Sequence, residues 1–243
     1  MSVPTAGIVV IGNEILSGKV VDGNSNWLAV ELRRLGVELR RVITIPDEID
    51  VIAATVAEFH AAYDHVFTSG GIGPTHDDVT IAGVAAAFGK DVIRHPELVD
   101  GLRHHLGDRV NEHHLKMAEV PEGATLLPDE NLGFPTVAME NVYILPGIPE
   151  ILKRKFAAMA ERFSSAPYFL RLIYSRHHES EIADFLNRVT ADLPEVMIGS
   201  YPKLNNPDYS VKLTIESKDE SVVRRAFDLL LELLPEEAVF KTE

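Results

Sequence analysis

Short apolar runs alternate with segments of helical periodicity along the first two-thirds of this 243-residue chain. Residues 6–11 are apolar and mostly β-branched, as expected for a strand that is covered on both faces. Residues 37–45 and 65–68 predict further strands, and the intervening segments 24–36 and 49–59 carry apolar side chains at helical spacing. Repeated strand–helix units predict a three-layer α/β domain in which a mostly parallel sheet lies between helices.

The same pattern continues beyond a glycine-rich segment. Residues 81–89 predict a helix, and residues 91–118 look mainly helical. Residues 136–138 and 142–145 predict two strands joined as a hairpin, and residues 149–163 predict a closing helix. These elements complete a first domain that we assign to residues 1–164.

The segment Ser164-Ser165-Ala166-Pro167 predicts a domain boundary, and a smaller second domain follows over residues 168–243. Its order of strand, helix, strand, strand, helix and strand predicts a ferredoxin-like α+β arrangement. The predicted strands are 168–174, 196–201, 210–217 and 238–241, and the predicted helices are 179–193 and 220–234.

Composition excludes several classes of function. The sequence has no cysteine, so it has no disulfides, thiolate metal sites or cysteine nucleophiles. Its net charge of −14 disfavours binding to nucleic acid, which requires clustered Lys and Arg, and to an anionic membrane. No apolar run approaches the roughly 20 residues that span a bilayer, and the first residues lack a signal-peptide pattern. We therefore expect a cytoplasmic protein, in which any phosphate site supplies its own positive potential.

Residues 68–80, Thr-Ser-Gly-Gly-Ile-Gly-Pro-Thr-His-Asp-Asp-Val-Thr, form the most distinctive motif. Glycines after a parallel strand let backbone amides approach an anion, and the next helix N-terminus adds partial positive charge. The motif lacks the Gly-Lys-Ser/Thr of a Walker loop and the third glycine of a dinucleotide fingerprint. A plain glycine turn with Asp78 as helix cap stays the alternative. The predicted substrate-binding residues here are Ser69, Gly70, Gly71, Gly73, Pro74, Thr75 and Thr80.

Carboxylates near this loop indicate a hard divalent cation such as Mg²⁺. Asp77 and Asp78 belong to the loop, and we expect Asp78 to face the cleft. Glu14 follows the first strand, and strand ends converge at one edge of a parallel sheet, although a solvated loop position is the alternative. Asn24 and Asp47 lie in connections at the same edge, where Asn24 serves equally well as a helix cap.

The segment Pro146-Gly147-Ile148-Pro149-Glu150 forms a rigid turn from a strand into a helix. We predict that Pro146 and Gly147 wall the pocket, and a purely structural turn or an oligomer contact stays open. The ten histidines form no His-Glu-x-x-His motif, so we expect surface or capping roles for them. A Gly-x-Ser-x-Gly elbow is also missing, which disfavours a serine hydrolase.

Four motifs together resemble the molybdopterin-binding (MoaB/Mog-like) domain family: Gly-Asn-Glu-Ile-Leu-Ser-Gly, Asp-Gly-Asn-Ser-Asn, the glycine motif, and Ile-Leu-Pro-Gly-Ile-Pro-Glu. The sequence is most similar to the CinA N-terminal branch and to the molybdopterin-binding-like region of FAD synthases, and the similarity extends to Gly199-Ser200-Tyr201-Pro202. The resemblance implies a molybdopterin-binding fold, a site at the glycine loop, and a homo-oligomer, either dimer or trimer. Asn13 departs from the family, which commonly has aspartate there.

The resemblance also implies roles for individual residues. The two functional aspartates of Mog-type enzymes correspond to Asp47 and Asp78, and the CinA and FAD-synthase branches are associated with metal-dependent cleavage of ADP-ribose or FAD. We therefore expect a nucleotide pyrophosphatase in which Asp78, Asp47 and Glu14 are catalytic and Asp78, Asp77 and Glu14 bind the cation. The alternative is a protein that binds or adenylylates molybdopterin, whose ligand would be a pterin phosphate.

Overall fold

The computed structural model describes residues 3–128 and 134–243, so residues 1–2 and 129–133 of the predicted first domain lie outside the described residues. Contacts within the chain form two compact units, which divide between Ser165 and Ala166. The division falls inside the segment 164–167 that the sequence marks as a boundary. Each unit has its own sheet and its own hydrophobic core.

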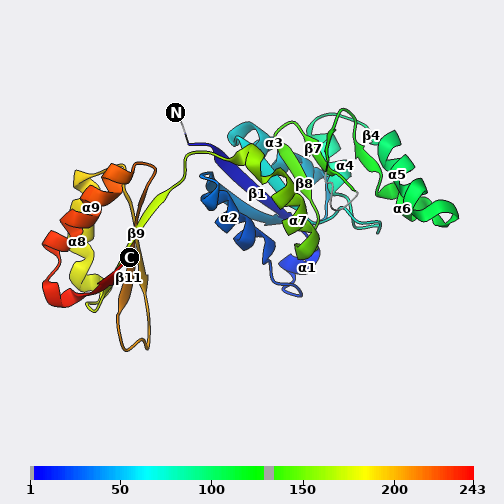
Figure 1. Ribbon diagram of the computed structural model, residues 1–243. Helices are drawn as coiled ribbons and strands as arrows, with labels where there is room; N and C mark the ends of the chain where they lie inside the picture. Colours follow the sequence, from blue (N-terminus) through cyan, green and yellow to red (C-terminus); the bar gives the residue numbers. More distant parts are fainter. Residues whose placement is uncertain (1–2, 129–133) are drawn as a thin grey trace. The chain divides into compact units, whose positions relative to one another are not determined.

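The first unit is built on a six-stranded, mostly parallel sheet (Figure 1). Its neighbouring pairs β2–β1, β1–β3 and β3–β8 are parallel, whereas β8–β7 and β7–β6 are antiparallel. The predicted hairpin is confirmed, since β7 returns directly into β8 through Glu140, which has a φ of 51°. In sheet order the strands are β2 (Glu38–Ile45), β1 (Thr5–Ile11), β3 (His65–Ser69), β8 (Val142–Leu145), β7 (Thr136–Met139) and β6 (Thr125–Leu127).

Helices cover both faces of this sheet, as predicted. Helices α2 (Asn24–Arg34) and α7 (Pro149–Met159) pack on one face, and α3 (Ile49–Ala62) and α4 (Thr80–Ala87) pack on the other (Figure 1). The strands supply side chains to both sides because successive residues of a strand point in opposite directions. Within β1, Ile8 lies in the core beneath α2 and α7, and its neighbour Val9 lies in the core beneath α3 and α4.

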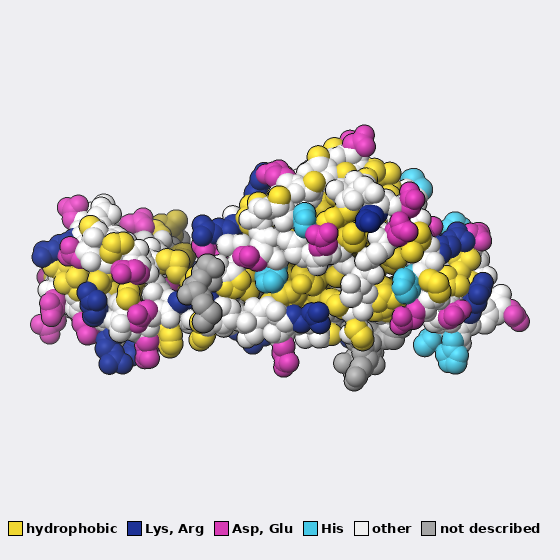
Figure 2. All heavy atoms as spheres, turned by 90° about the horizontal axis from the view of Figure 1, so that it is seen from above, with side chains coloured by type: hydrophobic (Ala, Val, Ile, Leu, Met, Phe, Trp, Pro, Cys, Tyr) yellow, Lys and Arg dark blue, Asp and Glu magenta, His cyan; other side chains and the backbone are white. Residues whose placement is uncertain are grey.

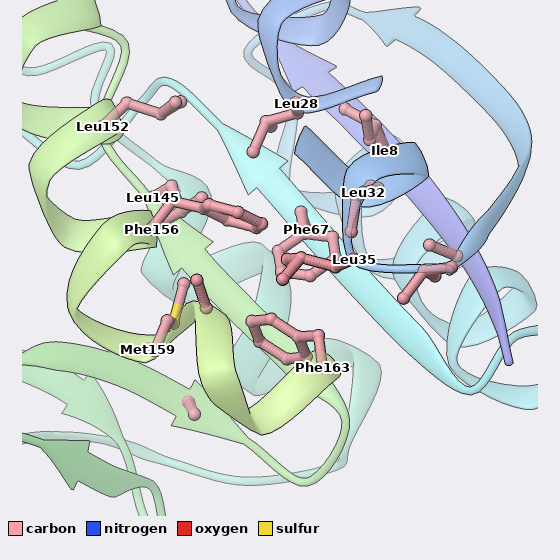
Figure 3. Packing of buried hydrophobic residues seen from close by; sticks show 14 of the residues in the cluster. Ile8, Leu28, Leu32, Leu35, Phe67, Leu145, Leu152, Phe156, Met159 and Phe163 are labelled. Carbon is pink, nitrogen blue, oxygen red and sulfur yellow. The ribbon is translucent and has the colours of Figure 1, made fainter. Parts of the chain in front are cut away.

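Aromatic rings dominate the core beneath α2 and α7 (Figure 3). Phe67 of β3 packs edge-on against both Phe156 and Phe163, with ring centroids 5.6 and 5.1 Å away. Trp27 meets the edge of Phe156 at 5.6 Å, and Tyr143 stacks on Phe67 at 5.4 Å. These contacts fix α7, its 3-10 extension Ala160–Phe163, and therefore the turn that precedes α7, against the sheet.

Between α4 and β6 the structure differs in part from the prediction. Helices α5 (Pro96–Leu106) and α6 (Glu112–Lys116) are helical as expected. The start of the segment is not helical, because β4 (Val92–Arg94) pairs with β5 (Glu119–Pro121), which follows the segment, in a separate antiparallel ribbon. Strand β4 is too short to show an alternating pattern on its own, so the sequence assigns it to the neighbouring helix.

Two short elements complete the first unit. Asn111 caps α6, as its side chain accepts a hydrogen bond from the backbone N–H of His114 at 3.1 Å. A single helical turn, α1 (Asn13–Leu16), follows β1 directly and places residues 13–16 beside the end of the sheet. A 3-10 turn (Gly107–Arg109) links α5 to α6.

The second unit confirms the predicted ferredoxin-like order. Its four strands form an antiparallel sheet in the order β10-β11-β9-β12, and the two helices pack on it through a core that includes Ile173, Leu213 and Leu230. Its elements are β9 (Phe169–Ser175), α8 (Glu179–Asp192), β10 (Met197–Pro202), β11 (Val211–Ser217), α9 (Glu220–Leu233), a 3-10 turn (Glu236–Ala238) and β12 (Val239–Thr242).

No helix in the described part of the chain combines the length and apolarity that a membrane span requires. On the face of the molecule shown in Figure 2, acidic side chains lie among basic ones and form no single patch. On that face the acidic charge is therefore not concentrated in one place, and the local arrangement of charges decides what can bind at any one site.

Candidate functional site

A pocket of about 800 Å³ opens at the carboxyl ends of the central parallel strands. Ile11, Ser69 and Pro146, which lie at the ends of β1, β3 and β8, are among its lining residues. Ligands of open α/β sheets bind at this edge because the connecting loops diverge there. Most of its walls are apolar, and its polar groups come from the glycine loop and the neighbouring turns.

The glycine loop approaches the first strand too closely for a side chain. Gly70 has a φ of 107°, and a Cβ atom there would lie 2.2 Å from the carbonyl oxygen of Ile11. Gly71 has a φ of 64°, and its Cβ would lie 2.3 Å from Oγ1 of Thr80. The N–H of Gly70 donates to the Leu145 carbonyl at 3.1 Å, which joins the loop to β8. The motif therefore needs glycine for both conformation and space.

Asn24 connects three parts of the pocket wall. Its Nδ2 donates to Oγ of Ser69 at 3.0 Å and to the carbonyl of Gly147 at 2.8 Å. Asn24 and Ser69 are both buried, with 7% and 3% of their surfaces exposed. The alternative in which Asn24 caps α2 is wrong, because Gly23 holds the cap position and the carboxylate of Asp22 accepts the hydrogen bond from the Ser25 N–H in the first turn. Asn24 instead fixes α2, β3 and the turn after β8 to one another.

Thr75 organises the acidic end of the glycine loop. Its backbone N–H donates to Oδ2 of Asp78 at 2.8 Å, and its hydroxyl contacts Oδ2 of Asp78 at 2.5 Å and Oδ1 of Asp77 at 2.6 Å. The hydroxyl of Thr75 lowers the pKa of Asp77, with smaller contributions from other groups that include Lys116. The alternative in which Asp78 caps α4 is wrong, because Val79 holds that position and no side chain caps the helix.

A second, polar pocket of about 560 Å³ is lined by Glu14, Asp47 and Asp77. The backbone N–H of Asn13 donates to Oδ2 of Asp47 at 2.8 Å, which fixes that carboxylate beside α1. The carboxylate of Glu14 folds back over Gly12, where a Cβ atom would lie 2.5 Å from Oε1. Glu14 lines the polar pocket and the large apolar pocket, so it lies where the two approach each other.

The structure brings most of the predicted site residues together. Asp47 and Asp77 line the polar pocket, and Glu14 lines both. Thr75 and Thr80 do not line either pocket, and the buried hydroxyl of Thr80 donates to the Gly70 carbonyl at 2.9 Å. Apart from Glu14, the predicted residues that line the large pocket are Asn24, Ser69, Gly70, Gly71, Gly73, Pro74, Asp78, Pro146 and Gly147.

The further lining residues of the large pocket, which the sequence did not point to, include Lys116, Phe134 and Lys155. Lys155 is buried in α7, and its Nζ donates to the carbonyls of Phe134 and Pro135 at 2.8 and 2.9 Å. Lys116 lies at the end of α6 and donates to the Thr75 carbonyl. Each of these residues reaches the pocket only through tertiary packing, and no local motif marks it.

Among residues 3–128 and 134–243, no group of three or more His, Cys, Asp or Glu side chains is arranged to hold a metal ion. The carboxylates of the polar pocket are nevertheless hard oxygen donors of the kind that Mg²⁺ prefers. Magnesium commonly takes one or two protein carboxylates and completes its shell with water and substrate phosphate. The donor set fits a cation that arrives with a phosphorylated ligand.

Comparisons with known proteins assign both units. Residues 7–165 match the model of the probable molybdopterin binding domain, and residues 167–243 match that of the FAD synthase middle domain. A protein of Archaeoglobus fulgidus is 35% identical over 93% of this chain and 96% of its own length. A probable FAD synthase of Caenorhabditis briggsae is 35% identical over 95% of this chain but only 49% of its own length. The chain thus spans about half of that relative.

A solved structure supports the same assignment. CinA of Thermoplasma acidophilum, a protein of unknown function, has 28% sequence identity and a TM-score of 0.61, and the match covers 66% of this chain and 99% of that one. The similarity agrees with the three-layer fold of the first unit. The chain belongs to the molybdopterin-binding domain family, in a CinA-like form that carries an FAD synthase middle domain after it.

Proposed function

We propose that the first unit hydrolyses a nucleotide pyrophosphate, such as ADP-ribose or FAD, with the help of a divalent cation. The position of Glu14 is the observation that carries the proposal, because this carboxylate lines both the apolar pocket and the acidic pocket. A ligand whose heterocycle occupies the first pocket would place its diphosphate beside the carboxylates that line the second. The similarity to probable FAD synthases supports this class of ligand.

The large pocket suits an amphipathic nucleotide. Its volume of about 800 Å³ lies in the range of small-molecule sites, which is roughly 300–1,000 Å³. Apolar side chains such as Ile72, Val79 and Phe134 offer surfaces for a planar base. The backbone N–H groups of residues 71–73 are the amides of the loop that can approach the diphosphate, because the Gly70 amide is bonded to Leu145 and residue 74 is proline. Thr75 would join them only after its hydroxyl leaves Asp77 and Asp78.

The carboxylates have different roles in this proposal. Glu14, with Asp47 or Asp77, would hold the cation, which when bound neutralises negative charge that develops on the bridging oxygen. Asp78 orients a water molecule and accepts its proton. The oxygen of this water forms a bond to one phosphorus, and the bond from that phosphorus to the bridging oxygen breaks. The products are two phosphate monoesters, one of them AMP.

Chromatography of the products tests the proposal. The whole chain would be incubated with FAD, ADP-ribose, NADH and coenzyme A, with Mg²⁺ or Mn²⁺ and with EDTA. We expect AMP from FAD or ADP-ribose in the presence of metal and none in EDTA. If no substrate is cleaved with any metal, the chain is not a pyrophosphatase of this class.

A second candidate function is the binding or adenylylation of molybdopterin. The family model that matches residues 7–165 favours it, and an apolar pocket with a glycine loop also suits a pterin phosphate. Pterin fluorescence in the purified protein, together with no cleavage of the four substrates, would support this candidate. A pterin-free preparation that releases AMP would exclude it as the main activity.

A further inference from the structure

The phosphate end of the large pocket has an unfavourable electrostatic setting. Asp77 and Asp78 lie in the glycine loop, and Glu14 faces the same pocket as Asp78. Negative charges this close to one another repel a phosphate, and solvent screens the repulsion only in part at a partly buried site. A helix N-terminus supplies only about half a unit of positive charge. A phosphate therefore needs an additional positive group close to the loop.

Two lysines line this pocket within the described residues, and they occupy different places. The ammonium group of Lys155 donates to the carbonyls of Phe134 and Pro135, and its cation lies 5.7 Å from the Phe134 ring centroid. It therefore stabilises one wall of the pocket. Lys116 extends from α6 to the glycine loop itself, where its ammonium group donates to the carbonyl of Thr75.

The contact between Lys116 and Thr75 is one that a ligand can replace. A carbonyl group is a neutral acceptor, and a phosphate oxygen is a charged acceptor that forms a hydrogen bond roughly twice as strong. Lys116 is only partly buried and Thr75 is exposed, so water can solvate the released carbonyl. The exchange therefore leaves no buried group without a partner and favours the phosphate.

We propose that Lys116 is the phosphate-binding cation of this pocket, which contacts the ligand phosphate beside the glycine loop. The inference rests on the proposed function for its ligand class, a nucleotide with a diphosphate, and assigns the positive group that this class requires. Because the attraction is between charges, the effect of Lys116 on binding must grow with ligand charge and fall with added salt. A lysine that only braces the loop would produce neither dependence.

Calorimetry on the whole chain tests this assignment, with ADP-ribose and AMP as probes in EDTA, so that no turnover occurs. Lys116→Met keeps the length of the side chain and removes its charge. Since hydrogen bonds to charged groups contribute about 1.5–3 kcal/mol, we expect binding of ADP-ribose to weaken about 10- to 100-fold. The loss should be smaller for AMP and at 0.5 M NaCl. Lys116→Arg should retain affinity within several-fold, because guanidinium also binds phosphate.

Lys90→Met is the matched control, because Lys90 is exposed and lines neither pocket. It should bind both probes like the wild type. Equal affinity of Lys116→Met and wild type would overturn the inference and leave the proposed function intact. An equal loss of ADP-ribose affinity at low and high salt would also overturn it. The same holds if Lys116→Met is unfolded by circular dichroism and Lys116→Arg, although folded, fails to restore binding. If the wild type binds neither probe in EDTA and also fails to bind them with Mg²⁺, the proposed ligand class itself is wrong.

Discussion

At the scale of single residues, Gly70 is under the most severe backbone constraint in the loop. Its φ is 107°, and a Cβ atom at this position would lie 2.2 Å from the carbonyl oxygen of Ile11. A side chain therefore fits only if the main chain moves. For Gly70→Ala we expect the free energy of unfolding to fall by at least about 2 kcal/mol, because a strained backbone conformation costs about 1–3 kcal/mol even without a clash. The measurement is urea unfolding.

Gly89→Ala is the control for this prediction, since Gly89 also has a positive φ, 62°, but has open space around it. Its free energy of unfolding should fall by only about 1 kcal/mol, the cost of placing alanine at a positive φ without a clash. Equal urea midpoints for the two variants would show that the close approach of the loop to β1 contributes nothing to stability.

Asp64 gives the fold a predictable dependence on pH. Its Oδ2 accepts hydrogen bonds from the backbone N–H and the hydroxyl of Thr5, at 2.7 and 2.8 Å, and these bonds lower its pKa. A carboxyl whose pKa is lowered by folding stabilises the protein above its unfolded pKa of about 3.9. This contribution is lost as the pH falls through the folded pKa.

Asp64→Asn should therefore be less stable than the wild type at pH 7, by no more than about 1 kcal/mol because the group is exposed and screened. The difference should shrink below pH 4. Urea midpoints at pH 7, 5 and 3.5 measure it, and a difference that stays constant over this range would contradict the role assigned to the charge.

The sequence predicts the local part of the site and misses the part that depends on distant contacts. Gly70 and Gly71 could be identified because several glycines directly after a predicted strand indicate a tight loop with positive φ angles, which glycine adopts most readily. Thr75 was expected to face the ligand, but its hydroxyl is bonded to two carboxylates that are only two and three residues away. Lys116 could not be identified, since it lies 41 residues from the carbonyl it contacts and no periodicity links them.

At the scale of secondary structure elements, prediction succeeded where an element is long enough to show its period. Helices α3 and α9 and strand β11 follow clear patterns and appear as expected. The ribbon of β4 and β5 was missed because each strand has three residues, whose pairing is decided by the chain folding back on itself.

Helix α7 depends on Phe156, which is 1% exposed and contacts the rings of Trp27, Phe67 and Phe163. Truncating a buried phenylalanine leaves a cavity, so Phe156→Ala should destabilise the first unit by about 3–5 kcal/mol. Urea unfolding would measure the loss. Ala157→Ser changes the exposed neighbour on the same helix and should stay within about 0.5 kcal/mol of the wild type. A loss below 1 kcal/mol for Phe156→Ala would mean that α7 is not held by this cluster.

At the scale of the whole molecule, both units have their own core, but the proposed chemistry belongs to the first unit alone. Every residue that lines the two pockets belongs to the first unit, and the core of the second unit shares no residue with the cores of the first. The sequence predicted both folds because each unit repeats a regular pattern of strands and helices. It predicted a site at the carboxyl edge of the first sheet, but not that this site consists of two adjoining pockets and that α6 lines the larger one.

The central claim is that carboxylates at these adjoining pockets carry out hydrolysis, and Asp78→Asn tests it most directly. The rate of AMP release from ADP-ribose with Mg²⁺ would be compared in the wild type, Asp78→Asn and the exposed control Asp108→Asn. We expect Asp78→Asn to lower turnover by about 10²-fold or more, the scale of lost electrostatic stabilisation, while circular dichroism and Asp108→Asn remain like the wild type. An Asp78→Asn protein that turns over ADP-ribose at the wild-type rate would contradict the mechanism.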